Sequence, residues 1–363
     1  MHTDSKTNYS RAFPWVAVGA LVLVNALWGI SFPIVKVLNA LTDSHFGINV
    51  ADESNAFRLL ASSWLLATRF SLAFILLLVF AFRLVYETTR REWWAGCIIG
   101  VLFFSGMVLQ VIGLATIPAS RSGFLTSLTT VFTPIFGIVM FRIFPSRWMV
   151  IGVVLALFGV VVLTGLIIVD DTGIRLAEDA SERWTLGDTM TTIASMFFAF
   201  QVLLLDHFGK QMRSLTLTCG MFVTTAALSW LLFAALVMSP WFVDADGARM
   251  QVEDWGMLTG SFGYLASLFV LASLCSVVSF GLMNRFQPHV TASQAAIIYS
   301  LEPVFASTWA LFLPSWLSVA TGMDHANEVW TWNLVFGGVL ILVANVVALL
   351  PGHKPAAAIV ELH

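Results

Sequence analysis

Residues 13–38 read FPWVAVGALVLVNALWGISFPIVKVL, and this stretch decides the fold class of the chain. Lys36 is its only charged side chain. At about 1.5 Å of rise per residue, a helix of this length crosses a hydrocarbon core of about 30 Å. The stretch is longer than the apolar core of a signal peptide and follows a polar segment, residues 1–11. It therefore predicts a retained first transmembrane helix.

The composition of the whole chain also indicates a protein embedded in a lipid bilayer. Of the 363 residues, 58% are hydrophobic and 11% are charged, against roughly 25% charged residues in soluble domains. A single soluble core stops growing with chain length and could not bury this much apolar surface. An open sheet would leave unpaired backbone groups in lipid, and no alternation at period 2 indicates a barrel. The sequence predicts an all-α integral membrane protein.

Ten apolar stretches of membrane-spanning length alternate with polar segments. They occupy residues 13–38, 62–84, 93–115, 119–142, 146–169, 187–206, 214–239, 258–284, 291–314 and 331–350. We expect each stretch to form one transmembrane helix. Gly152, Ala156 and Gly159 give the fifth stretch a small-residue face suited to close helix packing.

The basic residues predict the orientation, because Lys and Arg collect on the cytoplasmic side of a membrane. With a cytoplasmic N-terminus, eleven of the 18 Lys and Arg residues lie in cytoplasmic segments and five in external segments. Lys36 and Arg69 lie inside spans. We therefore expect a multi-pass protein of the plasma membrane, such as a bacterial inner membrane, with both termini cytoplasmic.

An internal repeat divides the chain into two halves. An offset of 173 residues aligns residues 119–132 with residues 292–305, and six of the fourteen positions are identical. The first copy enters the membrane from outside and the second from the cytoplasm, so the two five-helix units are inverted. The predicted organisation is a first repeat at 1–170, an external acidic linker at 171–186, a second, inverted repeat at 187–352 and a cytoplasmic tail at 353–363.

Three motifs resemble one known family. They are NALWGISFP at 25–33 followed by Lys36, QVIGL at 110–114 followed by ASRSGFL at 119–125, and SLEPVF at 300–305. In this order they resemble the EamA family of the drug/metabolite transporter superfamily. The resemblance implies ten helices, a central substrate cavity between the halves, alternating access, and export of amino acids or related metabolites.

The chain departs from the family pattern in its external loops, which are longer than usual. These are residues 39–61, 170–186, 240–257 and 315–330. They are consistent with a partial lid or a surface for a partner. Simple insertion is the third interpretation, because long surface loops add little closure entropy.

Glu302 is the ionisable residue expected nearest the bilayer midplane. Such residues mark functional sites unless a partner satisfies them. Pro303 follows it and removes one helical donor. We weigh two roles for Glu302: a substrate-binding or proton-carrying carboxyl, and a structural group that terminates or pairs helices.

Three cations lie toward the external ends of their predicted spans, where the positive-inside rule disfavours them. Lys36 and Arg69 are candidates for binding a carboxylate or phosphate of a substrate. Extension to lipid headgroups and pairing with Glu302 are the alternatives. Arg121 lies near the end of its span, so we expect it to reach the outer headgroups.

Asn25, Trp28 and Ser31 share one face of the first predicted helix, because they are spaced by three residues. An aromatic ring with polar neighbours suits the wall of a substrate cavity, and helix packing is the competing interpretation. Further candidates for the same cavity are Gln110, Ser293, Gln294 and Tyr299.

We expect a secondary transporter, and specifically an exporter, that moves a small polar or amphipathic metabolite such as an amino acid by alternating access through a midplane cavity. The alternative is a non-transporting scaffold or sensor that binds a partner through its long external loops. No HExxH motif, Gly-rich phosphate loop or intramembrane aspartate pair is present, so no catalytic residue, metal or cofactor is expected. The expected partners are a small-molecule substrate and the lipid bilayer, not nucleic acid; a homodimer is left open.

Overall fold

The structure is a computed structural model, and it describes residues 14–48, 55–141, 146–170, 173–176, 183–209, 211–238, 251–289, 298–348 and 350. Helices dominate these residues. The longer ones are α1 (Pro14–His45), α2 (Asn55–Tyr86), α3 (Arg90–Thr116), α6 (Arg147–Leu163), α8 (Leu186–Gly209), α9 (Ser214–Val237) and α16 (Trp332–Ala348).

Shorter helices follow one another in three places. They are α4 (Ala119–Thr126) and α5 (Thr129–Phe141); α10 (Val252–Gly260), α11 (Phe262–Ala272), the π-helix η1 (Ser273–Val278), α12 (Ser279–Phe286) and the 3-10 turn η2 (Gln287–His289); and α14 (Glu302–Ala310) and α15 (Leu313–Thr321).

Six helical segments of the described chain are long and apolar enough to cross a membrane, and α6 and α16 are shorter apolar helices. Their outward faces carry large apolar side chains that a soluble protein would bury. On α6, for example, Val154 is 63% exposed and Leu157 is 57% exposed. The outer surface of the helical bundle is therefore suited to lipid, as the composition predicts.

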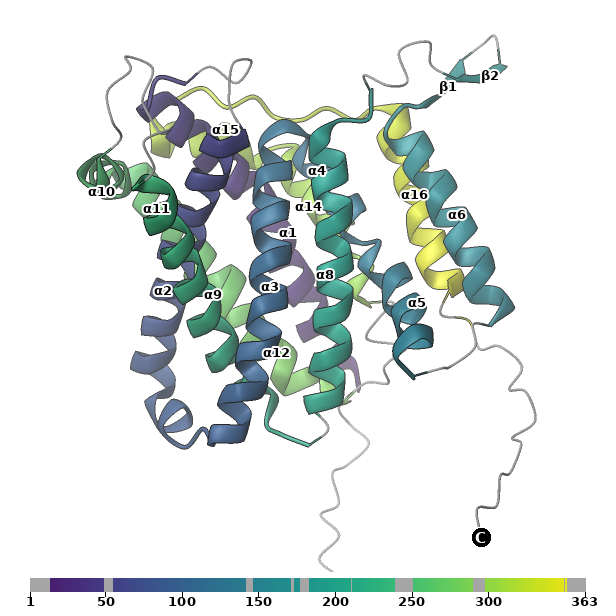
Figure 1. The fold of residues 1–363 in the computed structure, drawn as a ribbon. Helices are drawn as coiled ribbons and strands as arrows, with labels where there is room; N and C mark the ends of the chain where they lie inside the picture. Colours follow the sequence, from purple (N-terminus) through teal and green to yellow (C-terminus); the bar gives the residue numbers. More distant parts are fainter. Residues whose placement is uncertain are drawn as a thin grey trace, which may run out of the picture.

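The two ends of the bundle differ (Figure 1). One end, the hairpin end, carries strands β1 (Ile167–Asp170) and β2 (Gly173–Leu176) together with α10 and α15. The other, the turn end, carries the connection between α2 and α3 at residues 87–89. Exposed aromatic side chains lie near both ends, as in the interfacial belts of membrane proteins. They are Trp316, Trp330 and Trp332 near the hairpin end, and Tyr86 and Trp94 near the turn end.

Helix α3 lies at the centre of the packing, against α8 and α9, while α1 packs on α14 and α12 (Figure 1). Glycines allow the closest approaches, because backbones meet where a side chain is missing. A Cβ atom on Gly96 would lie 2.6 Å from the carbonyl oxygen of Leu217 and 2.8 Å from the Cα of Gly220. Helices α3 and α9 therefore touch backbone to backbone.

Helix α6 packs on α16 through the small-residue face predicted from the sequence. Ala156 is 1% exposed. A Cβ atom on Gly152 would lie 2.6 Å from the Cβ of Ala348, and one on Gly159 would lie 2.8 Å from Cγ1 of Ile341. The predicted packing role of this face is confirmed.

Replacing Gly96 with valine should separate α3 from α9. The new side chain meets backbone atoms, which cannot rotate away, so we expect a loss of about 3 kcal/mol of unfolding free energy. Thermal unfolding of the purified protein in detergent measures it. The matched control is Gly19→Val on α1, where a Cβ meets nothing within 4 Å. Equal melting temperatures for the two variants would contradict the expected contact.

The first two helices are longer than the sequence predicted. Helix α1 continues to His45 instead of residue 38, and α2 begins at Asn55 instead of residue 62. A buried ion pair makes the extension possible: Arg58 donates two hydrogen bonds to Asp43, at 2.8 and 3.0 Å. Each helix therefore extends beyond its apolar stretch, because its polar residue there is buried against a partner of opposite charge.

Three of the predicted continuous spans are interrupted. The span at 119–142 breaks between α4 and α5, and the span at 258–284 contains the π-helix η1. Part of the span at 291–314 lies outside the described residues; its described part starts α14 at Glu302 and breaks again before Pro314, near the start of α15. Prolines are tolerated in a first helical turn, so Pro303 begins a helix here and does not distort the middle of one.

The all-α prediction also missed one small feature. Strands β1 and β2 pair antiparallel, with Ile167 opposite Leu176 and Asp170 opposite Gly173. Gly165, at a φ of 73°, lies between the end of α6 and the start of β1. The hairpin lies in the segment predicted as a loop and linker, so it leaves the predicted helical membrane fold unchanged.

Candidate functional site

Trp28 is the centre of an aromatic cluster inside the bundle. Its ring centroid lies 5.6 Å from that of Phe280 on α12 and 5.7 Å from that of Tyr299. Its indole Nε1 donates a hydrogen bond to Ser279 Oγ at 3.0 Å, and the Tyr299 hydroxyl donates to Gln287 Oε1 at 3.0 Å. Two residues predicted to line the cavity, Trp28 and Tyr299, are thus in contact.

The neighbours of Trp28 on the predicted polar face of α1 bond within their own helix. Asn25 is fully buried and its Nδ2 donates to the carbonyl of Leu21 at 2.7 Å. Its Oδ1 has no partner among the described residues. The Ser31 hydroxyl donates to the carbonyl of Trp28 at 2.6 Å. Trp28 is therefore the member of this face that reaches across to other helices.

Glu302 begins α14 and is half-buried. Within the described part of the chain, its carboxylate accepts no hydrogen bond and forms no ion pair. Its helix packs closely on two others: a Cβ on Gly29 of α1 would lie 2.7 Å from the backbone nitrogen of Ala306, and one on Gly123 of α4 would lie 2.8 Å from the Ala306 Cβ. Glu302, unpaired among the described residues, therefore begins the helix that packs on α1 and α4.

Gln110 bonds across to α4, because its Nε2 donates to Thr126 Oγ1 at 2.9 Å. On the other side of the break that follows α4, the Thr129 hydroxyl donates to the carbonyl of Ser195 on α8 at 3.2 Å. These contacts tie the interrupted fourth span to both of its neighbours. Ser293 and Gln294, the other predicted cavity residues, lie outside the described residues.

Lys36 and Glu328 meet at the hairpin end. Lys36 Nζ donates to the carbonyl of Ile117 at 2.8 Å, and the Glu328 carboxylate interacts electrostatically with the same lysine. Glu328 also accepts hydrogen bonds from the N–H of Ala119 and from the N–H and hydroxyl of Ser120, at 2.5, 3.3 and 2.5 Å. It therefore satisfies free donors at the start of α4, where Pro118 offers no side-chain cap.

Glu328 is delivered by an extended segment, residues 322–331, which we call the strap. The strap crosses the hairpin end from α15 to α16 (Figure 1). The Glu328 N–H donates to the carbonyl of Ala310 at 2.9 Å, and Asn327 Oδ1 accepts from the N–H of Ser315 at 2.9 Å. The strap is thus fastened to α14, α15 and α4.

Arg121 does not reach the outer headgroups, and that prediction is wrong. Its Nε lies 2.6 Å from Asp188 Oδ1, and its Nη2 donates to Asp188 Oδ2 at 2.6 Å and to the carbonyl of Arg183 at 2.8 Å. Asp188 is fully buried and also accepts from the N–H and hydroxyl of Thr185. The guanidinium turns inward because a buried carboxylate on α8 offers a bidentate partner.

The Asp43–Arg58 pair is a third polar contact at this end, and an aromatic cluster covers it. The cluster includes Trp255 of α10, whose ring centroid lies 4.5 Å from that of Phe46 and 6.3 Å from that of Phe57. Helix α10 is fixed further, because His45 Nε2 contacts the carbonyl of Asp254 at 3.0 Å. The hairpin end is therefore closed by polar contacts and buried aromatic rings together.

Arg69 lies deeper in the bundle and is 5% exposed. Its Nε donates to Ser276 Oγ of the π-helix η1 at 3.2 Å. Within the described chain it forms no ion pair. Since Lys36 bonds to Ile117 and Arg69 to Ser276, neither forms the pair with Glu302 that we had considered as an alternative.

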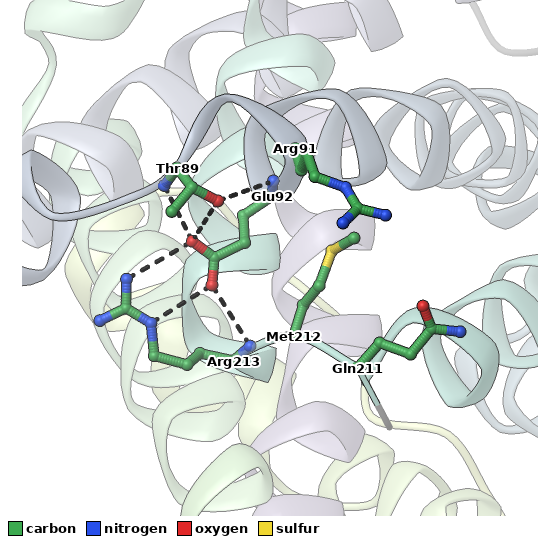
Figure 2. A pocket seen from close by; sticks show the side chains of 6 residues that line it. All are labelled: Thr89, Arg91, Glu92, Gln211, Met212 and Arg213. Atoms are coloured by element: carbon green, nitrogen blue, oxygen red, sulfur yellow. Dashed lines mark hydrogen bonds and ion pairs between the residues drawn. The ribbon is translucent and has the colours of Figure 1, made fainter.

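A hollow of about 440 Å³ lies at the turn end (Figure 2). Its lining residues are Thr89, Arg91, Glu92, Gln211, Met212 and Arg213. Glu92 caps α3 together with Thr89 and accepts from Arg213 Nε at 3.2 Å. These bonds raise the pKa of the Arg213 guanidinium above its usual value. Glu92 therefore caps α3 and also holds Arg213, the residue that precedes α9.

Some of these contacts could be predicted from the sequence and others could not. Thr89 with Glu92, and Thr185 with Asp188, follow the spacing of helix N-terminal capping boxes and could have been recognised from that spacing. Glu328 and the Asp43–Arg58 pair have no such local signal, because their partners lie on other elements. No group of three or more His, Cys, Asp or Glu side chains suited to a metal is found in the described residues.

These features define a multi-pass helical membrane protein with polar side chains buried between its helices. Residues 15–165 match the model of the EamA-like transporter family, in agreement with the resemblance seen in the motifs. A curated relative from Archaeoglobus fulgidus, named an uncharacterized transporter, is 23% identical over 327 residues, covering 90% of this chain and 83% of the relative. A solved structure titled only as the crystal structure of a protein is 16% identical, with a TM-score of 0.45, covering 89% of this chain and 96% of the other.

Proposed function

We propose that the protein is a secondary transporter that exports a small polar or amphipathic metabolite, such as an amino acid, by alternating access. The observation that carries the proposal is half-buried Glu302, which has no partner among the described residues and begins the helix α14 that packs on α1 and α4. An ionisable group at lipid depth is unfavourable unless it serves a solute or ion pathway. Trp28 and Tyr299 supply an aromatic surface for the apolar part of such a solute.

The two inverted halves at 1–170 and 187–352, joined by the linker at 171–186, remain part of this proposal. Its support is a symmetric set of helix contacts. In the two halves α1 corresponds to α8, α2 to α9, α3 to the α11–α12 segment, and α4 to α14. The contacts α3–α8, α3–α9 and α1–α14 therefore correspond to α1–α12, α2–α11 and α4–α8. All six contacts are present. An inverted repeat is the arrangement that lets one packing geometry alternate between two sides of a membrane.

We place the hairpin end outside the cell and the turn end, both termini and the tail at 353–363 in the cytoplasm. The turn end exposes Arg83, Arg90, Arg91 and Arg213, as the positive-inside rule requires of a cytoplasmic surface. The strap, the Arg121–Asp188 pair and the Asp43–Arg58 pair then close the external side. In this assignment the structure represents a state of the transport cycle that is shut to the outside.

The scaffold alternative receives less support from the same contacts. The strap and α10, which belong to two of the long loops, fold back onto the protein through Glu328 and Trp255 and so present less free surface to a partner.

Counterflow in proteoliposomes tests the proposal. Purified protein is reconstituted, loaded with one member of a panel of amino acids and small organic acids, and exposed to the radiolabelled solute outside. We expect accumulation of at least one solute above protein-free vesicles. No accumulation of any panel member, with folded protein verified by its size-exclusion profile, would count against transport and favour a scaffold.

Glu302→Gln tests whether this carboxyl carries a proton during transport. Glutamine keeps the shape and removes the titration, so we expect the pH dependence of flux between pH 5 and 8 to flatten severalfold while folding is retained. The control is Glu87→Gln, an exposed carboxylate that pairs with Arg83 at the turn end. A pH profile identical to that of the unmodified protein would exclude the proton-carrying role.

A further inference from the structure

Arg69 is a buried cation with no counter-ion among the described residues. Its guanidinium is enclosed by α2, by the π-helix η1 and by the ring of Phe70, whose centroid lies 5.3 Å from Cζ. Of its three nitrogens, Nε binds Ser276 Oγ, while Nη1 and Nη2 bond to nothing in the described part of the chain. Two other arginines that point inward differ: buried Arg58 and half-buried Arg121 each have a bidentate carboxylate.

An uncompensated charge in this position is unfavourable, because removing an ion from water costs several kcal/mol even after relaxation of its surroundings. Proteins retain such charges in membranes where they serve a substrate or ion. The π-helix beside Arg69 supports the same interpretation, since π-helical turns occur frequently at functional sites. Here η1 directs Ser276 toward Arg69.

Arg69 is connected to the proposed transport site. Ser279 accepts from Trp28 Nε1 and donates to the carbonyls of Cys275 and Ser276, and Ser276 in turn holds Arg69. A second connection runs through aromatic rings: Phe70 contacts Phe222 at 5.4 Å, Phe222 contacts Phe280 at 5.6 Å, and Phe280 contacts Trp28 at 5.6 Å between centroids.

We propose that Nη1 and Nη2 of Arg69 bind the carboxylate of the transported solute, while the aromatic side chains around Trp28 and Phe280 contact its apolar part. The fork of two donors matches the two oxygens of a carboxylate. One positive charge is balanced by one negative charge, whereas a phosphate monoester carries about −1.5 to −2 and would leave excess charge in a medium of low dielectric. The substrate class is therefore a small aromatic or otherwise amphipathic monocarboxylate, and this inference rests on the proposed transport function.

Binding is tested with probes that share one apolar group and differ in the head group. Benzoate, benzamide and phenyl phosphate form one set; phenylalanine and its amide form a second. Melting temperatures of the purified protein are recorded with each probe, because a ligand of the folded state raises them. We expect the carboxylates to stabilise the protein with at least tenfold greater affinity than their amides, and phenyl phosphate to bind more weakly than benzoate.

Two substitutions assign that preference to Arg69. Arg69→Gln should remove the preference for carboxylate over amide, and Arg69→Lys should retain part of it, since lysine keeps the charge without the fork. The control is Arg83→Gln, which removes an exposed arginine from the same helix at the turn end. We expect it to keep the full carboxylate preference. The ligand-free Arg69→Gln protein should melt at or above the temperature of the unmodified protein, whereas an arginine with a purely structural role would lower it on removal.

The outcomes separate this inference from the transport proposal. Carboxylate binding that depends on Arg69 supports the site even if no flux is found in vesicles. If the folded protein binds amides as well as acids, or if Arg69→Gln leaves the preference intact, the site is overturned even when counterflow succeeds. Stronger binding of phenyl phosphate than of benzoate would overturn the carboxylate assignment.

Discussion

Replacing Asp188 with alanine is expected to cost about 3 to 5 kcal/mol of unfolding free energy, because it leaves the buried guanidinium of Arg121 without its partner. Arg121 Nη2 would retain the carbonyl of Arg183 at 2.8 Å, but this neutral acceptor cannot balance the charge. The N–H of Thr185 would also lose the carboxylate that satisfies it at the start of α8. Two structural roles therefore fail with one substitution.

A double-mutant cycle separates these two roles. Asp188→Ala with Arg121→Leu removes the orphaned charge, so the double variant should recover a large part of the loss and keep only the missing cap. Unfolding is followed by thermal or denaturant titration in detergent, with single and double variants compared under the same conditions. An Asp188→Ala protein within 1 kcal/mol of the unmodified protein would contradict the buried pair.

The sequence predicted the positions of the helices well where apolar side chains decide them. The stretches at 93–115 and 187–206 agree with α3 and α8 to within a few residues, because a helix in lipid must be apolar over its whole crossing. It failed at the ends of α1 and α2, where Asp43 and Arg58 stabilise each other across two helices. A pairing of this kind depends on tertiary contact, and periodicity within either helix contains no trace of it.

The same distinction explains the candidate site. Trp28 and Tyr299 could be selected because an aromatic or polar residue is unusual in its apolar surroundings, and the structure brings them into contact. Arg121 was misassigned because its partner, Asp188, lies at the start of a different predicted span. The residues that close the hairpin end were the hardest to foresee, since Glu328 acts on a helix about 200 residues earlier in the chain.

Removing the Glu328 carboxylate should open the hairpin end. It accepts three hydrogen bonds from the start of α4 and interacts with Lys36. Hydrogen bonds to a charged group contribute roughly 1.5 to 3 kcal/mol. If these interactions stabilise the closed state alone, Glu328→Ala shifts the equilibrium between the closed and open states roughly 10- to 100-fold toward the open state.

A thiol placed behind the strap reports the change. Cys97, Cys219 and Cys275 are free thiols, so they are first replaced by serine, and Ser122, fully buried on α4, becomes the single cysteine. We expect a hydrophilic, membrane-impermeant thiol reagent to label it at least tenfold faster in the Glu328→Ala background. Glu253→Gln, a change to an exposed carboxylate on α10 at the same end, should leave the rate unchanged.

The labelling rate distinguishes a latch from a simple structural contact. A latch holds one of two folded states, so its loss increases labelling while the melting temperature falls little. A contact that only supports the fold would lower the melting temperature and leave the labelling of the remaining folded protein unchanged. Glu328→Gln refines the result: it keeps one acceptor oxygen for Ala119 or Ser120 but loses the charge that faces Lys36. Labelling intermediate between the unmodified protein and Glu328→Ala would show that charge and hydrogen bonding both hold the hairpin end closed.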